Sequence, residues 1–173
     1  ALREIKPGNI VNIGIGIPEL VAEEVLDSGM LEQVHLSVES GHTGGFPLGA
    51  QGFGVAIGPD SMMDMSRQFD FYEGGGLDLC CVGALQIDGR GNVNGHYTKG
   101  KLSGIGGFAN ITQTTKKVVF CLTFTSHGLE GEFDGKNVHI TKEGTIQKFL
   151  PEVTSLSFSV DNALKNGQEV LYI

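Results

Sequence analysis

The first 40 residues contain the pattern that most restricts the fold. Asn9–Gly14 is short and largely apolar, which is typical of a strand buried in a parallel sheet. Pro18 suits the first helical position, apolar side chains then recur on one helical face, and Gly29 stands where a C-terminal cap belongs. A second strand is predicted at 34–38. The order strand, helix, strand predicts a βαβ unit, and therefore an α/β fold with a mostly parallel sheet.

Glu39 directly follows the second predicted strand, in the stretch Ser37-Val38-Glu39-Ser40-Gly41-His42-Thr43-Gly44-Gly45-Phe46-Pro47. The carboxyl ends of parallel strands meet at the edge of the sheet where α/β proteins bind ligands. The glycines beyond Glu39 leave backbone N–H groups uncovered by side chains. A solvated loop carboxylate followed by ordinary turns is the alternative, and on this segment alone it is the simpler interpretation.

Glycine is unusually abundant and occurs in clusters. The chain has 27 glycines in 173 residues, more than twice the average usage of about 7%. Gly41–Gly58 is too long for a simple turn and too apolar to be disordered, and Lys101–Ile111 is a second glycine-rich segment. We expect this clustering to mark turns whose backbone approaches a ligand closely.

The rest of the chain is predicted to contain further strands and one short helix. The helix lies within 64–72, after a capping box at Ser61–Asp64 and before Gly74-Gly75-Gly76. A buried strand is expected at 77–84, and further strands are expected at 117–124 and 169–173. The strand at 77–84 is predicted to pair antiparallel with a short strand near Val93. The segments 138–140 and 145–147 are predicted to form a hairpin around Glu143-Gly144.

Composition excludes several classes of protein. The hydrophobic share of 40% and charged share of 18% are ordinary for one folded domain, and no stretch approaches the roughly 20 apolar residues of a membrane span. A net charge of −8 argues against a nucleic-acid surface. The three cysteines match neither a disulfide framework nor a zinc spacing. We therefore expect buried, reduced thiols in a cytoplasmic protein, without a signal peptide or a metal site.

Other motifs have weaker signals. Gly14-x-Gly16 opens a helix as in dinucleotide-binding folds, but the third glycine is missing. Asp64, Asp70 and Glu73 could supply an acid–base pair, and ion pairs on a helix surface explain them equally well.

Three motifs in order carry a family resemblance: Ser37-Val38-Glu39-Ser40-Gly41-x-x-Gly44-Gly45, Gln68-Phe69-Asp70-Phe71-Tyr72-x-Gly74-Gly75-Gly76-Leu77-Asp78, and Gly104-x-Gly106-Gly107-Phe108-x-Asn110-Ile111. The chain resembles the family I coenzyme A transferases, particularly the single-chain acetate/propionate type. Essentially the whole chain is similar to their carboxyl-terminal, β-subunit-like half. The resemblance implies an open α/β/α sandwich, one domain over 1–173 that is truncated at both ends relative to the family.

The resemblance also implies a mechanism. In the family a glutamate, here Glu39, attacks an acyl-CoA, passes through a mixed anhydride and becomes a glutamyl–CoA thioester before CoA moves to a second carboxylic acid. This is a ping-pong cycle with CoA as a substrate and no permanently bound cofactor. Backbone N–H groups of Gly106 and Gly107 are the candidate oxyanion donors. The candidate substrate-binding residues are Gly44, Gly45, Phe46, Gly104, Phe108 and Lys101, with Lys99 or Lys101 near a phosphate, and Phe46, Phe53 and Phe108 are candidate walls against water.

Two features limit what the resemblance implies. His42-Thr43 is polar where members of the family often carry apolar or proline-containing pairs, so acyl preference can differ. The amino-terminal, α-subunit-like half helps close the family's active site, and it is expected as a partner in cis or as a separate chain, within a homo- or hetero-oligomer. An acyl-CoA hydrolase, a non-catalytic sensor, a sugar-phosphate isomerase relative and a purely structural subunit remain as alternatives.

Overall fold

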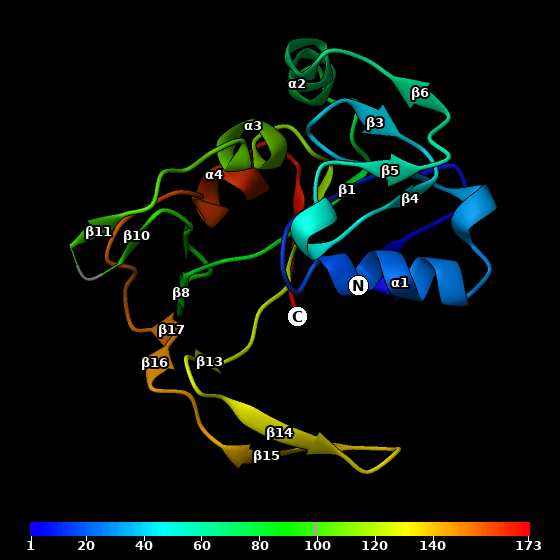
Figure 1. Ribbon diagram of the computed structural model, residues 1–173. Helices are drawn as coiled ribbons and strands as arrows, with labels where there is room; N and C mark the ends of the chain where they lie inside the picture. The colour runs from blue at the N-terminus through cyan, green and yellow to red at the C-terminus, as the bar shows by residue number, and fades with distance from the viewer. Residues whose placement is uncertain (99) are drawn as a thin grey trace.

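The computed structural model describes residues 1–98 and 100–173. Within them the chain forms a seven-stranded sheet of order β18-β12-β7-β1-β2-β3-β6 (Figure 1). The strands from β18 to β2 are parallel to one another, and β3 and β6 add an antiparallel edge. Their bounds are β1 Ile10–Ile13, β2 His35–Ser37, β3 His42–Thr43, β6 Ser61–Met62, β7 Leu79–Val82, β12 Lys117–Phe120 and β18 Glu169–Tyr172.

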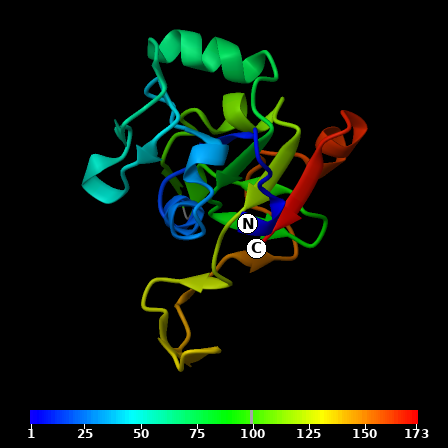
Figure 2. The same cartoon turned by 90° about the vertical axis from the view of Figure 1, so that its right-hand side faces the viewer.

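Helices cover both faces of this sheet. Apolar residues of α1 pack on one face with η1 nearby, whereas α2, α3 and α4 contribute to a separate apolar cluster on the other face. Figures 1 and 2 show the resulting three layers. The predicted α/β/α sandwich is therefore confirmed. The helices are α1 Glu19–Asp27, α2 Met65–Glu73, α3 Phe108–Thr112 and α4 Val160–Lys165, with 3-10 turns η1 Leu2–Glu4, η2 Leu31–Gln33 and η3 Ala50–Gly52.

The central strand β7 explains why the sheet is buried on both sides. All four of its residues are buried, and their side chains alternate between the two faces. Cys80 and Val82 pack with α2, α3 and α4, whereas Leu79 and Cys81 pack with α1. A continuous apolar run is thus what a strand covered by helices on both faces requires.

The predicted βαβ unit is present. β1 and β2 pair in parallel, with Ile10 opposite His35, and α1 connects them. Gly29 has φ +73, the left-handed conformation expected just beyond a helix end. Pro18 lies one position earlier than predicted, as the N-cap of α1.

The predicted capping box at Ser61–Asp64 is wrong. Ser61–Met62 is strand β6, which pairs with β3, and α2 begins only after Asp64. Asp64 is the N-cap residue, but its side chain makes no capping hydrogen bond. Strand pairing at the sheet edge, which a local motif cannot register, decides the conformation of Ser61.

Two predicted strand pairings are also wrong. The strand near Val93 is β9, and it pairs with β8 instead of β7. β7 has no free edge, because β1 and β12 pair with it on either side. The segment around 138–140 belongs to β15, which pairs with β14 across the turn 134–137, while β16 pairs with β13. Asp134 stabilises that turn by accepting hydrogen bonds from the backbone N–H groups of Lys136 and Asn137.

Short strands form the smaller sheets beside the seven-stranded sheet, and of these β8 and β9 contribute Ile87 and Val93 to the core. In Figures 1 and 2 the β14–β15 hairpin extends away from the body of the molecule, and all its strand residues are exposed. The pairs and their bounds are β4 Phe46–Pro47 with β5 Ala56–Ile57, β8 Gln86–Asp88 with β9 Val93–Asn94 and β17 Phe149–Leu150, β10 Tyr97–Thr98 with β11 Lys101–Leu102, β13 Thr125–Ser126 with β16 Ile146–Gln147, and β14 Glu130–Phe133 with β15 Val138–Lys142.

The three cysteines are buried and unbridged, as predicted. Burial raises the pKa of Cys80 to about 12, so its thiol stays protonated at neutral pH. Among the helices of residues 1–98 and 100–173, none combines the length and the hydrophobicity needed to cross a membrane. In the same residues, no cluster of three metal-binding side chains occurs.

Candidate active site

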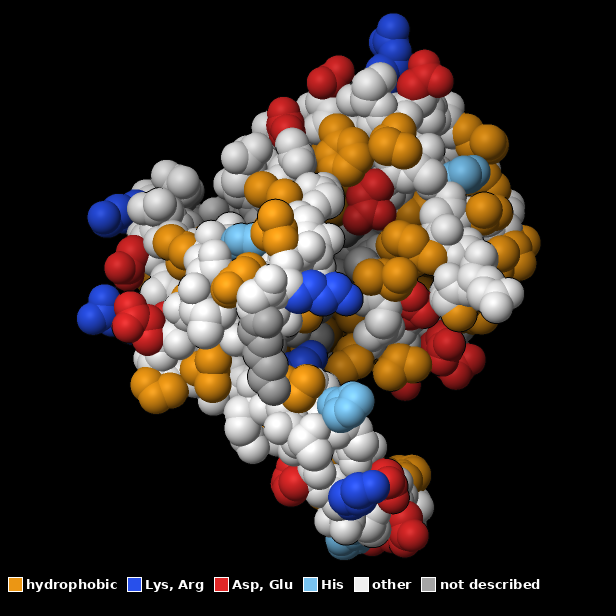
Figure 3. Space-filling model, turned by 60° about the vertical axis from the view of Figure 1, so that its left-hand side comes forward, with side chains coloured by type: hydrophobic (Ala, Val, Ile, Leu, Met, Phe, Trp, Pro, Cys, Tyr) orange, Lys and Arg blue, Asp and Glu red, His pale blue; other side chains and the backbone are white. Residues whose placement is uncertain are grey.

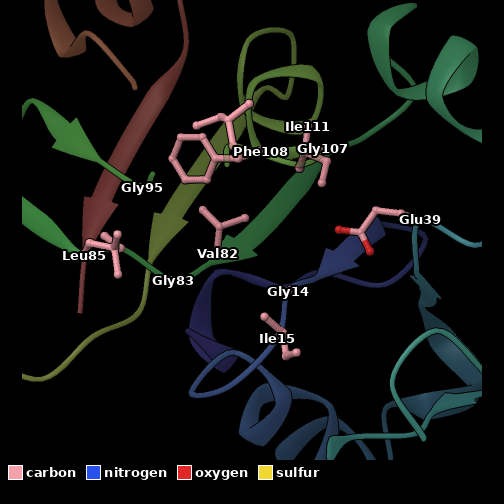
Figure 4. A pocket seen from close by; sticks show the side chains of 12 residues that line it. Gly14, Ile15, Glu39, Val82, Gly83, Leu85, Gly95, Gly107, Phe108 and Ile111 are labelled. Atoms are coloured by element: carbon pink, nitrogen blue, oxygen red, sulfur yellow. The ribbon is translucent and has the colours of Figure 1, made fainter. Parts of the chain in front are cut away.

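A cavity of about 370 Å³ opens where the strands β1 and β7 end and the chain turns after β2. Figure 4 shows the Glu39 side chain entering this cavity from one side, opposite Phe108 and Leu85. These segments meet because parallel strands place their carboxyl ends at the same edge of the sheet. The lining residues are Gly14, Ile15, Glu39, Val82, Gly83, Ala84, Leu85, Gly95, Ile105, Gly107, Phe108 and Ile111.

A tight turn directs Glu39 into the cavity. The Val38 N–H donates to the His42 carbonyl oxygen at 3.1 Å, and the Gly41 N–H donates to the Val38 carbonyl oxygen at 3.1 Å. Gly41 has φ +114, and a Cβ added there would lie 1.8 Å from the carbonyl oxygen of Met63. Glycine is therefore required at this position, because the backbone of 63 occupies the space of a side chain.

The environment of Glu39 makes its carboxylate more basic than usual. Burial raises the pKa of Glu39, and a hydrogen bond from its own backbone opposes this effect to a smaller extent. Most of the lining side chains are aliphatic or aromatic, and no lysine, arginine or histidine lines this cavity in the described residues. A partly desolvated carboxylate without a cationic partner is suited to act as a nucleophile.

Gly107 and Phe108 line the same cavity as Glu39. Gly107 is the N-cap of α3, a helix that the sequence analysis did not predict. A Cβ at Gly107 would lie 2.6 Å from the ring of Phe69, so this glycine lets α3 approach α2. Gly106 does not line the cavity, although it is adjacent in the chain. Within the described residues, the N–H groups of Gly106 and Gly107 make no hydrogen bond.

The structure places three of the predicted substrate-binding residues away from this cavity. A Cβ at Gly44 would lie 2.0 Å from Asp60 Oδ2, and one at Gly45 would lie 2.3 Å from the Ile57 carbonyl oxygen. Phe46 packs against the apolar cluster that includes α1. Close packing within the segment 44–60 thus explains both glycines, and packing against the α1 cluster explains the aromatic ring, without a ligand.

The remaining predicted residues also lie outside the cavity lining. Lys101 is exposed in β11, opposite Thr98 of β10. Gly104 has φ +83 with open space around it. Phe53 does not line the cavity either. Lys99 lies outside the described residues.

Several lining residues that the sequence did not indicate come from two other strand ends. Gly14 and Ile15 follow β1. Val82 is the last residue of β7, and residues 83–85 follow it. A Cβ at Gly14 would lie 2.9 Å from the Cys81 carbonyl oxygen, so a glycine there allows the two strand ends to converge. Their positions in the sequence could have indicated these residues, because both strands were predicted and the carboxyl ends of parallel strands lie at the same edge of the sheet as Glu39.

A second cavity of about 680 Å³ adjoins the first, and the two share Leu85. Its lining includes Gln86, Tyr97, Thr154 and the half-buried Lys148. The Lys148 Nζ donates to the Ala84 carbonyl oxygen at 3.1 Å, and burial lowers the pKa of this amine. Figure 3 shows a hollowed face of the molecule with hydrophobic side chains around the hollow.

Residues 1–132 match the sequence pattern of a family described as Coenzyme A transferase. The chain belongs to this family. The match includes Glu39, Gly107 and Phe108, and it confirms the family resemblance found in the sequence.

Curated relatives extend the match to the whole chain. The chain is 38% identical over 173 residues to the acetate CoA-transferase YdiF of Escherichia coli strain K12, and 40% identical over 178 residues to the caffeate CoA-transferase of Acetobacterium woodii. All of this chain is covered, but only 33% and 34% of the two relatives, so the chain spans about a third of their length. It is also 32% identical to the acetate CoA-transferase subunit beta of E. coli K12, over 69% of this chain and 59% of that subunit.

A solved structure confirms the fold. The acyl-CoA transferase YdiF of E. coli O157:H7, in a thioester complex with CoA, superposes with a TM-score of 0.91 at 36% identity. The superposition covers 99% of this chain and 32% of that protein.

Proposed function

We propose that the complete protein containing this chain is a CoA-transferase that moves CoA between a short-chain acyl-CoA and a carboxylic acid, with Glu39 as the covalent nucleophile. The observation that carries this proposal is the Glu39 carboxylate, held in a mostly apolar cavity at the carboxyl edge of the sheet. The names of the relatives, an acetate and a caffeate CoA-transferase, support the reaction class. The thioester complex of YdiF with CoA supports a covalent intermediate.

The proposed cycle begins when a Glu39 carboxylate oxygen attacks the thioester carbonyl carbon. The C–S bond breaks, CoA leaves as a thiolate, and an acyl–glutamyl anhydride remains. The thiolate then attacks the glutamyl carbonyl, which forms the Glu39–CoA thioester and releases the first acid as a carboxylate. The incoming acid reverses both steps. Because every bond broken is matched by one formed, no redox reagent or metal ion is needed for the balance.

The cavity supports three requirements of this cycle. The raised pKa makes the ionised carboxylate of Glu39 a stronger nucleophile. Gly107 lines the cavity, and its N–H, with that of Gly106, is the proposed donor to the oxyanion of each tetrahedral intermediate. The aliphatic and aromatic lining would limit the access of water to the anhydride and thioester.

The length of the relatives supports a partner for this chain. We propose that 1–173 is one catalytic domain, and that an amino-terminal half, in cis or as a separate subunit, completes the site within an oligomer. The second cavity, which adjoins the first at Leu85, would leave room for the part of acyl-CoA beyond the thioester. Soluble substrates and buried free thiols are consistent with a cytoplasmic enzyme.

The direct test is Glu39→Ala in the complete protein, assayed by exchange of CoA between propionyl-CoA and acetate. We expect activity to fall by at least about 10³-fold, because no other carboxylate lines the cavity in the described residues. Glu130→Ala, on the exposed β14 strand, is the matched control and should retain activity.

Two results would contradict the proposal. Activity of Glu39→Ala within about tenfold of wild type would reject Glu39 as the nucleophile. CoA release from propionyl-CoA at a rate that does not depend on acetate would identify a hydrolase instead. Mass spectrometry of the peptide containing Glu39, after reaction with propionyl-CoA, tests the thioester independently of turnover.

A further inference from the structure

A buried polar network lies beneath the turn that carries Glu39. Tyr72 of α2 and Ser37 at the end of β2 are joined through their hydroxyl oxygens at 2.7 Å. Gln68 of α2 donates from Nε2 to Ser37 Oγ at 2.8 Å, and Asn12 of β1 donates from Nδ2 to Tyr72 OH at 3.4 Å. All four residues are at most 1% exposed. Side chains of α2 and β1 thus converge on Ser37 at the end of β2.

Two side-chain carbonyl oxygens of this network accept no hydrogen bond from the described residues. Asn12 Oδ1 and Gln68 Oε1 are buried and have no hydrogen-bond partner in the described part of the chain. Both side-chain amides instead turn their N–H groups toward the hydroxyls and the backbone of Ser37. Buried, unpaired carbonyl oxygens destabilise a fold, and such departures concentrate at functional sites. The donor groups of both amides are thus directed at Ser37 and at its partner Tyr72.

Ser37 forms the base of the Glu39 turn. It is the last residue of β2, and its backbone carbonyl accepts a hydrogen bond from Asn12 Nδ2 at 3.4 Å. Its hydroxyl also lies 3.3 Å from Thr43 Oγ1, on the strand that leaves the turn. Ser37 therefore connects the strand before Glu39, the strand after it, and α2. Movement of Tyr72 would be passed to both ends of the turn.

The environment of Tyr72 keeps its hydroxyl in the neutral form. Burial raises the pKa of Tyr72, hydrogen bonds oppose this change, and the negative charge of Glu39 raises the pKa a little further. The hydroxyl accordingly carries its proton at neutral pH, and the carboxylate lies within electrostatic range of it. The adjoining rings of Phe69 and Phe71 hold the Tyr72 ring, with centroids 5.9 and 6.2 Å away.

We propose that Tyr72 is a positioning residue for Glu39, which it holds in reactive geometry through the Ser37 hydroxyl. This inference rests on the proposed function, because it assigns Tyr72 a role in the same covalent step. Tyr72 does not line the cavity and is not expected to touch the substrate. Its loss should therefore slow the attack of Glu39 while leaving the binding of acyl-CoA intact.

The test is Tyr72→Phe in the complete protein, which removes one oxygen and keeps the ring. We expect formation of the Glu39–CoA thioester, followed by mass spectrometry in a single turnover, to slow by about 10- to 100-fold, because small displacements of a reacting group have effects of this size. KM for acyl-CoA should stay within about twofold.

Tyr172→Phe is the matched control. Tyr172 lies on the edge strand β18, and its hydroxyl donates to the Gly91 carbonyl oxygen outside the cavity. This variant also loses one tyrosine hydroxyl that is bonded to a neighbouring segment, in a half-buried setting, and it should react at the wild-type rate. Ser37→Ala is the second test variant: it breaks the connection while Tyr72 remains, and it should reproduce the slower thioester formation even if Tyr72→Phe does not fold.

Several outcomes would overturn the inference. A folded Tyr72→Phe protein with the wild-type rate of thioester formation would reject it, as would a loss confined to KM or an equal loss in Tyr172→Phe. If Tyr72→Phe does not fold, a wild-type rate in Ser37→Ala would reject it. If wild-type Glu39 never becomes modified, the proposed function itself fails, and this result is distinct from failure of Tyr72 alone.

Discussion

The two glycine-rich segments have similar sequences but different relations to the fold. In the first, between Gly41 and Gly58, a Cβ at Gly41, Gly44 or Gly45 would overlap neighbouring atoms of the segment 57–63. In the second, Gly104 and Gly106 have positive φ values with nothing within 4 Å of an added Cβ. At these positions the first segment needs glycine for close packing, whereas Gly104 and Gly106 need it only for backbone conformation; in the second segment it is Gly107 that packs closely, against the ring of Phe69.

This difference indicates how each segment relates to the Glu39 cavity. The first segment holds the turn that carries Glu39, and its residues 44–46 do not line the cavity. The second segment contributes Gly107 and Phe108 to the lining, beside space that a substrate could occupy. A glycine cluster in a sequence therefore indicates a special backbone, but not whether protein or ligand lies against it.

The largest effect on stability is expected from Gly41→Ala. Its φ of +114 disfavours alanine, and the added Cβ would lie 1.8 Å from the Met63 carbonyl oxygen. We expect the free energy of unfolding to fall by about 3 kcal/mol or more, measured by urea denaturation. Gly8→Ala is the control, because Gly8 has φ +83 and no atom near an added Cβ. Equal losses in the two variants would show that packing against Met63 is unimportant.

A smaller loss is expected from Gly106→Ala in the second segment. The residue has φ +54, and an added Cβ meets no atom within 4 Å. Backbone strain alone should lower the free energy of unfolding by about 1 kcal/mol. Because alanine keeps the backbone N–H, CoA exchange should stay within about tenfold of wild type. A loss comparable to that of Gly41→Ala would remove the proposed distinction between the two segments.

The smallest change, a stabilisation, is expected from Glu39→Gln. Burial raises the pKa of Glu39 above its ordinary value of 4.5, so the folded state binds the proton more tightly than the unfolded state. Wild-type stability should therefore decrease as pH rises from 4.5 through the raised pKa, and then level off. Glutamine has no such transition, so its advantage should grow over that window and persist at neutral pH.

The measurement is the melting temperature of both proteins between pH 4 and 8, with Glu23→Gln on the exposed side of α1 as control. An advantage that disappears at neutral pH would mean that Glu39 is not destabilised by burial. Protonation of Glu39 removes the nucleophile, so we also expect CoA exchange to decline as pH falls through the raised pKa of Glu39.

Local patterns predicted most of the central sheet. The apolar runs at 9–14, 77–84, 117–124 and 169–173 each contain a strand of the sheet (β1, β7, β12 and β18), and the periodic segment after Pro18 is a helix. The position of Glu39 followed from the same pattern, since it stands directly after a predicted parallel strand. α3 was missed because five residues that follow a glycine cluster carry too little periodicity.

Pairing and contact between distant segments required the tertiary structure. β9 pairs with β8 because both edges of β7 are occupied, and Ser61 joins a strand because β3 offers a free edge. The connection from Tyr72 to Ser37 spans 35 residues, and nothing in either local sequence indicates it.

The sequence by itself determined the family, the α/β class and the carboxylate at the end of β2, because these depend on residue type and local periodicity. Only the tertiary structure decided which strand ends surround that carboxylate, which glycines pack against protein, and which buried hydroxyls hold the turn. These features arise from convergence of segments far apart in the chain, where burial and free sheet edges select among pairings that local sequence leaves equivalent.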